Sequence, residues 1–517
     1  MDYFYYDDHV ALSNPELNWT RQLMHQLRPI HGLVADLLTT GSPRHSGFRR
    51  LIGVLLLSSY AYVFLIWLIL SGFETSSAFL LCLICGTVPG FQNLVSYLVA
   101  SPALLGAFFG ASSVLLFGWG IYIRRHTVAV RVTIMAGTVI LLFLGLSTNG
   151  LTVLCCWPLW ICTLCSPRVA DWRVLIRSLI GFMVLFALAC VVHYGFFKMV
   201  STMTSLIPVL TQRASFVANP TDALEKIVWF VRDILPYSFV QLLRSLVPSM
   251  LPYYKFLRVG LPLIMALGAL SLFFCQKKPR PVEAILVLIL TGGLIPLCYL
   301  PFLVLREKGG FPYYFAALEA SFLCLFCAGC LNLGKLVLPT RYVRPVWLGA
   351  IGLLALLSAY TAHRNVMISY AVPNAIEYAF VKARLVEKDL TVIKEIHVRG
   401  SLNFSSVLSY SEGLVKAVLN ELHSGRRDLN ITSSSIDPPL VIFDPIYSRN
   451  KHLLGGYYVF NEYHGCYLMR NDMSQSDKDA LKSRWDELFA QKLQEKNILI
   501  VDLSKITSVI DTLKRRP

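Results

Sequence analysis

Two adjacent carboxylates near the start of the chain are the first residues that could carry out chemistry. Asp7 and Asp8 directly follow an aromatic run, Tyr3-Phe4-Tyr5-Tyr6. Aromatic side chains of this kind gather at the boundary between membrane and water. A carboxylate at the edge of a low-dielectric region becomes a stronger base, which suits removal of a proton from a hydroxyl group. The competing interpretation is a flexible acidic N-terminus without a role.

The cationic candidates are Arg28, Arg306 and Lys308. Arg28 stands before Pro29 and a helix-like segment at residues 30–38. It could hold a phosphate group through the planar fork of its guanidinium, or it could pair with a nearby aspartate. Arg306 and Lys308 follow an apolar segment and suit the phosphate of an anionic lipid. The alternatives are a headgroup anchor for Arg28 and an interfacial snorkelling pair for the other two.

A third candidate group is polar and lies between apolar stretches. The run from Pro89 to Tyr97 contains the polar residues Asn93 and Ser96. Placing polar side chains within a membrane costs free energy, so such residues are often functional. Asn93 and Tyr97 could therefore position a substrate. Helix packing through Asn93 and Ser96 is the competing account.

The thirteen cysteines predict neither a disulfide scaffold nor a metal site. Cys324 and Cys327 have CxxC spacing, but they lack partner histidines or cysteines in a loop. We therefore expect buried hydrophobic thiols in apolar helices.

The elements that must position these residues are predicted by composition. The 517-residue chain has 55% hydrophobic and only 15% charged residues, whereas soluble chains carry about a quarter charged residues. Its mean hydropathy is +0.57. These values favour a multispanning membrane protein over a cytosolic enzyme, a coiled coil or a disordered chain. The net charge of +16 does not indicate nucleic acid, because excess Lys and Arg collect in the cytoplasmic loops of membrane proteins.

About ten membrane spans are expected, at roughly 20 apolar residues for each helix. The clear candidates are 51–71, 127–147, 174–197, 258–275, 282–304, 312–333 and 343–362. A shorter stretch, 148–165, is expected to return as a hairpin with 127–147. The stretches 77–98 and 101–122 are interrupted by polar residues and prolines, so they form either two spans with a tight connection or a re-entrant leg.

Basic loops predict the orientation. They lie at residues 124–125, 168–177, 277–280 and 335–344. Placing them in the cytoplasm puts residues 1–50, the loop 198–257, the loop 305–311 and everything after residue 362 outside. Five arginines within the first 50 residues oppose this orientation. An N-terminus outside also needs an export signal, and a missing upstream helix would resolve both difficulties.

Three regions are predicted along the chain. Residues 1–50 form an extracytoplasmic segment with the candidate acids, residues 51–362 the transmembrane domain, and residues 363–517 a small α/β tail. The tail has strand-like segments at 440–443 and 498–501 and helical patterns at 408–422 and 475–495. Within the loop 198–257, an amphipathic pattern at 227–251 predicts a helix lying along the interface.

The order of these features resembles the serotype-converting O-antigen glucosyltransferases of bacteria and their phages, polytopic enzymes of the glycosyltransferase C class. The family shows an Asp-Asp pair, a Gly-Arg-Pro-Leu-like turn opening a helix, and a segment like Pro-Phe-Phe-x-Asn-Leu-Ser-Tyr-x-x-Asp. The matching runs are Tyr6-Asp7-Asp8, Leu27-Arg28-Pro29-Ile30 and Pro89-Gly90-Phe91-Gln92-Asn93-Leu94-Val95-Ser96-Tyr97. The chain departs from the pattern at Leu27 and after Tyr97, and the family's first span is absent before Asp7.

The resemblance implies a glycosyltransferase C-like fold and transfer of a sugar, glucose in that family, from a polyprenyl-phosphate donor to a surface polysaccharide. Asp7 or Asp8 would be the base, Arg28, Arg306 and Lys308 the phosphate partners, and Asn93 and Tyr97 the substrate-positioning residues. No cofactor is required, although a divalent cation could assist. The expected partners are the donor, the polysaccharide acceptor, the bilayer, a donor-synthesising transferase and a flippase. The expected location is the bacterial inner membrane, with the tail in the periplasm.

Two other classes compete with this hypothesis. A transporter or flippase for a lipid-linked or small solute usually shows inverted repeats and charges at the bilayer midplane. The sequence shows no repeat and almost no ionisable residues in the central spans. A membrane anchor that presents the tail as a binding domain would not need about ten spans.

Overall fold

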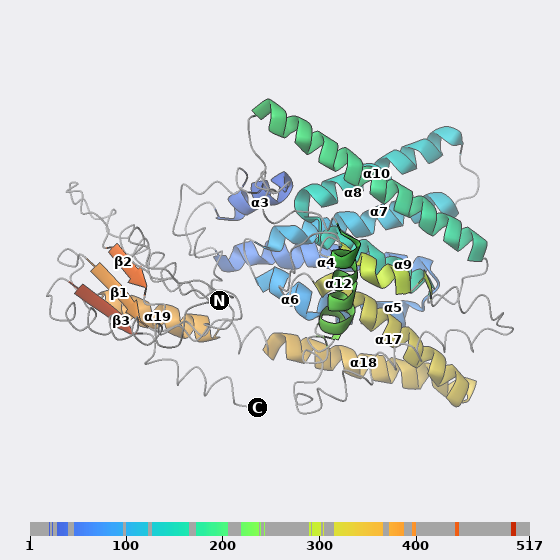
Figure 1. The fold of residues 1–517 in the computed structure, drawn as a ribbon. Helices are drawn as coiled ribbons and strands as arrows, with labels where there is room; N and C mark the ends of the chain where they lie inside the picture. Colours follow the sequence, from blue (N-terminus) through green and yellow to red (C-terminus); the bar gives the residue numbers. More distant parts are fainter. Residues whose placement is uncertain are drawn as a thin grey trace. The chain divides into compact units, whose positions relative to one another are not determined.

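The protein is an α-helical polytopic membrane protein, shown here as a computed structural model (Figure 1). The structure describes residues 20, 23, 28–39, 46–96, 100–122, 127–164, 172–204, 219–236, 238, 242, 289–290, 292–300, 303, 315–364, 372–386, 395–399, 440–443 and 498–502. The chain forms two compact units. The first contains Met1–Leu17, Thr39–Gly47 and Arg364–Pro517, and the second contains Asn18–Leu38 and Phe48–His363.

Within the described residues, five helical segments are long and apolar enough to cross a bilayer. They are Leu51–Leu70, Ser101–Gly120, Val128–Asn149, Val174–Val200 and Arg341–Arg364. They belong to helices α4 (Ser46–Leu70), α7 (Leu104–Tyr122, preceded by the 3-10 turn η2, Ser101–Ala103), α8 (Val128–Asn149), α10 (Trp172–Thr204) and α18 (Thr340–Arg364). Large apolar side chains on α8, α10 and α18 remain exposed, as expected for surfaces that face lipid.

In the part of the chain that the structure describes, six further apolar helical segments complete the second unit, and all of them except the first contribute residues to its buried core. They are α3 (Pro29–Thr39), α5 (Thr75–Gly86), α6 (Pro89–Ser96), the 3-10 helix η3 (Thr152–Cys156), α9 (Trp157–Leu164) and α17 (Ala316–Val337). The stretch 77–98 does not form one continuous helix, because a bend separates α5 from α6. The stretch 101–122, by contrast, forms a full-length helical span. The predicted spans at 258–275 and in much of 282–304 lie outside the described residues, so the total of about ten stays a prediction.

The contacts between helices define two ends of the second unit. At one end, which we call the α4-entry end, a methyl group placed on Gly53 would lie 3.0 Å from Ser101 Cβ and 3.7 Å from Val95 Cα. The Thr152 hydroxyl donates to the Ala103 carbonyl at 2.6 Å, which brings the turn after α8 to the start of α7. The beginnings of α4 and α7, the end of α6 and the end of α8 therefore lie together.

The opposite end, the α4-exit end, gathers the other helix termini. The indole N–H of Trp67 donates to the Leu159 carbonyl at 2.9 Å and to the Thr163 hydroxyl at 3.0 Å. Gly118 packs directly against the Trp67 ring. The ends of α4, α7 and α9 therefore lie together, so the basic loops that follow α7 and α9 leave from the same end.

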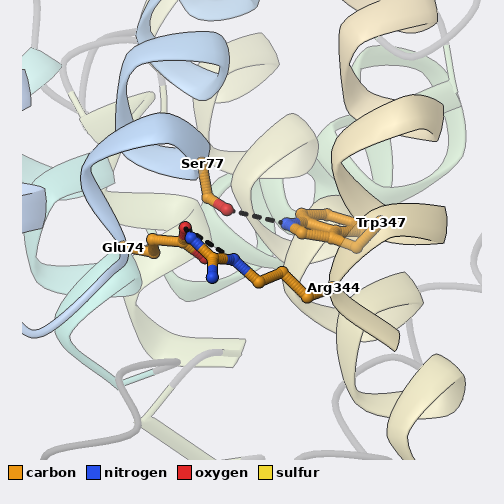
Figure 2. A network of polar contacts seen from close by, with 4 residues as sticks. All are labelled: Glu74, Ser77, Arg344 and Trp347. Carbon is orange, nitrogen blue, oxygen red and sulfur yellow. Dashed lines mark hydrogen bonds and ion pairs between the residues drawn. The ribbon is translucent and has the colours of Figure 1, made fainter. Parts of the chain in front are cut away.

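Helices α5 and α18 run side by side in the same direction (Figure 2). Arg344 Nε donates to Glu74 Oε1 at 3.0 Å, and Trp347 Nε1 donates to Ser77 Oγ at 3.0 Å. Farther along, Thr87 and Ser358 share a hydrogen bond between their hydroxyls. The basic start of α18 is therefore held beside the start of α5.

The helix predicted at 227–251 begins earlier than expected, and its place along the membrane interface stays a prediction. Helix α12 spans Pro220–Trp229 and continues into a π-helical turn, η4, at Phe230–Ile234. The amphipathic pattern alone predicted a start at residue 227, because it does not include the residues that mark a helix N-terminus. Asn219 is the N-cap, Pro220 occupies the first turn and Asp222 supplies an acidic side chain there, all typical of a helix start.

The described part of the tail contains helix α19 (Val372–Val386) and three strands, β1 (Glu395–Arg399), β2 (Leu440–Phe443) and β3 (Ile498–Asp502). The strands form a parallel sheet in the order β2-β1-β3. β2 and β3 confirm the strands predicted at 440–443 and 498–501. Parallel neighbours require crossover connections, but the helices predicted at 408–422 and 475–495 lie outside the described residues. The regional boundaries at residues 50 and 362 stay predictions.

Candidate functional site

The structure describes one cationic site residue, Arg28, at the start of α3. Its backbone N–H donates to the Leu23 carbonyl at 2.8 Å, and its carbonyl accepts from the Gly32 N–H at 3.1 Å, the first turn of the helix. Pro29 occupies the first helical position, where a missing N–H costs nothing. Arg28 is half-buried, and among the described residues no ion pair involves it.

An anion would find favourable surroundings beside Arg28. The first turn of α3 contains no acidic residue, and the free N–H groups of a helix N-terminus attract negative charge. Asp36 accepts hydrogen bonds from the Thr20 backbone N–H at 2.8 Å and from the Thr20 hydroxyl at 2.5 Å. These bonds attach the preceding chain to α3.

The other candidates are described only in part. Asn93 lies on the backbone of α6, but its side chain is outside the described residues. Asp7, Asp8, Tyr97, Arg306 and Lys308 also lie outside them. Their positions relative to Arg28 and their roles therefore stay predictions.

The segment that carries Asn93 has a well-defined backbone, which we call the α5–α6 elbow, residues 86–96. The Thr87 hydroxyl donates to the Ile84 carbonyl at 2.8 Å and closes the end of α5. The Gln92 side-chain amide donates to the Thr87 carbonyl at 2.5 Å. Phe91 is fully buried, with its ring centroid 5.1 Å from that of Tyr60 on α4.

The elbow lies at the α4-entry end, because Val95 approaches Gly53 there. Helix α3 is drawn at the same end as the start of α4 (Figure 1). Two runs singled out by the sequence, one around Arg28 and one from Pro89, are therefore carried by elements at one end of the unit.

Glu319 is the site residue that the sequence analysis missed. It is fully buried, one turn into α17, and its Oε2 accepts the Gly90 N–H of the elbow at 2.9 Å. The available signal was an acidic residue inside the predicted span 312–333, since such residues are rare and usually functional. It was passed over because it belongs to no motif.

The cysteines behave as predicted. Those whose side chains the structure describes are free thiols, and all of them except Cys190 are buried. Cys85 and Cys324 lie with their sulfur atoms 3.9 Å apart, between α5 and α17. Among the described residues no cluster of three His, Cys, Asp or Glu side chains could hold a metal ion.

Comparison with known proteins gives little further information. No family model and no curated protein matches the chain. A crystal structure of ArnT from Cupriavidus metallidurans bound to undecaprenyl phosphate matches with a TM-score of 0.38 and 11% identity, covering 98% of this chain and 87% of that one. The apo structure matches with a TM-score of 0.39 and 12% identity, covering 91% and 94%. A TM-score below 0.5 is too low to carry an argument about activity.

Proposed function

We propose that this chain is a membrane glycosyltransferase that moves a sugar from a polyprenyl-phosphate donor to a surface polysaccharide. Following the family resemblance, the sugar is glucose and the acceptor is an O-antigen. The enzyme lies in the bacterial inner membrane with its tail in the periplasm. The observation that supports the proposal is that α3, which follows Arg28, and α6, which begins at Pro89, both lie toward the α4-entry end of the second unit.

The reaction needs two kinds of group. A carboxylate, Asp7 or Asp8, takes the proton of the acceptor hydroxyl as its oxygen attacks the anomeric carbon. The bond from that carbon to the phosphate oxygen breaks, and polyprenyl phosphate leaves with the electron pair. Arg28, Arg306 and Lys308 neutralise the charge that develops on this phosphate. Adjacent residues in an extended segment point to opposite sides, so one aspartate serves as the base and its neighbour orients Arg28 or the sugar.

The test is sugar transfer by purified protein in lipid vesicles, with polyprenyl-phosphate-glucose as donor and O-antigen polysaccharide as acceptor. Asp7→Asn and Asp8→Asn are made singly, with Glu74→Gln as the matched control. Glu74 is an exposed acid at the start of α5, paired with Arg344 away from the elbow. We expect one of the two variants to lose transfer by about 10²-fold or more, the scale of general base catalysis, while the control keeps it.

Two outcomes would overturn the proposal. Transfer that survives unchanged in both aspartate variants removes the assigned base. A wild-type protein that moves a lipid-linked or small solute across the vesicle membrane without transferring sugar is a transporter or flippase.

A further inference from the structure

Glu319 is an acidic residue buried between apolar helices, and it has no role in the proposed reaction. It is fully buried on α17, and Oε2 accepts the Gly90 N–H at 2.9 Å. Its other oxygen, Oε1, has no hydrogen-bond partner in the described structure. Burying a carboxyl group among apolar side chains is costly unless it is hydrogen-bonded, so the bond to Gly90 offsets part of this cost.

The bond from Gly90 gives its backbone N–H a partner, and among the described residues no other hydrogen bond from this group is seen. Gly90 is the second residue of α6, and the first N–H groups of a helix have no partner within the helix. Gly90 is also buried, so water does not replace the missing partner. Glu319 therefore caps α6 from another helix, at a place where capping side chains normally come from the preceding residue.

The surroundings make this contact specific for its two residues. A methyl group placed on Gly90 would lie 2.6 Å from the Ala316 nitrogen and 2.7 Å from its Cα, so only glycine allows the elbow to approach α17 this closely. The bonds from Gln92 to Thr87 and from Phe91 to Val88 stay within the elbow. The Gly90–Glu319 bond is therefore a hydrogen bond that fixes the start of α6 against α17.

We infer that Glu319 is a positioning residue, which holds α6 and with it the substrate-positioning residue Asn93 in the place that sugar transfer requires. The inference rests on the proposed function. Asn93 follows Gly90 by one helical turn, so a shift at the start of α6 moves it directly. The requirement is for a hydrogen-bond acceptor at Oε2, which a glutamine also provides and an alanine does not.

The experiment compares Glu319→Gln and Glu319→Ala with a matched control, Ser321→Ala. Ser321 is equally buried on the same helix and bonds the Ala317 carbonyl and Cys298, away from the elbow. Hydrogen exchange of peptides covering residues 86–96 is measured by mass spectrometry in the full-length protein. We expect exchange at least tenfold faster in Glu319→Ala, and wild-type exchange in Glu319→Gln and Ser321→Ala.

Transfer kinetics provide the second measurement. Glu319→Ala should raise the donor KM at least tenfold while kcat changes less than threefold, and Glu319→Gln should restore the wild-type KM. The inference is overturned if Glu319→Ala matches Ser321→Ala in exchange and KM, or if Glu319→Gln is as impaired as Glu319→Ala. Hydrogen exchange does not depend on sugar transfer. A wild-type protein without transferase activity would thus refute the proposed function, while the exchange data still decide whether Glu319 fixes the elbow.

Discussion

At the scale of single residues, Arg28 is the candidate phosphate-binding residue that lies within the described part of the chain. Arg28 directly precedes the first residue of α3 and is half-buried, and the first turn of this helix contains no acid. Replacing Arg28 with alanine should lower transfer by about 10²-fold, the usual loss when one charge-stabilising contact is removed. Arg28→Lys should recover only part of it, because an ammonium lacks the bidentate fork.

The control for this prediction is Arg131→Ala. Arg131 is an exposed cation on α8, outside any candidate run. Transfer rates of the three variants, normalised to the amount of folded protein, decide the outcome. If Arg28→Ala transfers sugar as fast as Arg131→Ala, Arg28 is a headgroup anchor and does not bind the donor phosphate.

Residue types alone predicted part of the local structure. The Arg-Pro pair ahead of a helix-like segment predicted the start of α3, and apolar surroundings predicted that the cysteines are buried thiols, whereas the role of Arg28 stays a prediction. Glu319 could not be assigned, because its partner is a backbone N–H 229 residues away in the sequence. Every residue except proline has the same backbone N–H group, so residue types do not indicate which one a side chain will bind. A contact of this kind can be identified only from the folded structure.

At the scale of elements, the α5–α6 elbow depends on a glycine. Gly90→Ala would place a methyl group 2.6 Å from the backbone of Ala316. Overpacking of this kind typically costs about 1–3 kcal/mol. We expect a lower unfolding temperature in detergent and no rescue by Ala316→Gly, because the clash involves backbone atoms. Gly86→Ala is the control, since nothing lies within 4 Å of a methyl group there. Equal unfolding temperatures for the two variants would contradict the close approach.

The ion pair between α5 and α18 should contribute little to stability (Figure 2). The side chain of Arg344 is 71% exposed and that of Glu74 38%, and exposed pairs contribute about 0–1 kcal/mol. Arg344→Ala should therefore barely change the unfolding temperature. Arg344→Glu should lower it more, through repulsion from Glu74, and the double variant Glu74→Arg/Arg344→Glu should recover most of the loss. A double variant no better than Arg344→Glu would show that the pair does not form.

The elements were predicted unevenly from the sequence, for identifiable reasons. Long apolar runs gave α4, α8, α10 and α18, because bilayer thickness fixes their length. The elbow was left as two alternatives, since prolines and polar residues mark a break without giving its geometry. In the tail, two strands were predicted, but β1 was not, and it occupies the centre of the sheet. Strand order depends on pairing between distant segments, which a pattern along the chain does not encode.

At the scale of the whole molecule, the internal contacts of the helical unit constrain its topology. Glu74 and Arg344 are in contact, so the turn at residues 71–74 and the start of α18 must lie on one face of the membrane. The Thr152–Ala103 bond places the turn after α8 beside the start of α7, at the α4-entry end. The positive-inside rule then predicts that the α4-exit end, from which the basic loops leave, faces the cytoplasm and that the elbow lies outside.

Reporter fusions test this topology. Alkaline phosphatase, active only outside the cytoplasm, and a green fluorescent protein, fluorescent only inside it, are each joined after Gly72, Gly150, Pro339 and Pro517. We expect fluorescence at Gly72 and Pro339 and phosphatase activity at Gly150 and Pro517. Opposite results at Gly72 and Pro339 would contradict the pairing of α5 with α18. A fluorescent fusion at Pro517 would place the tail in the cytoplasm and contradict its proposed location in the periplasm.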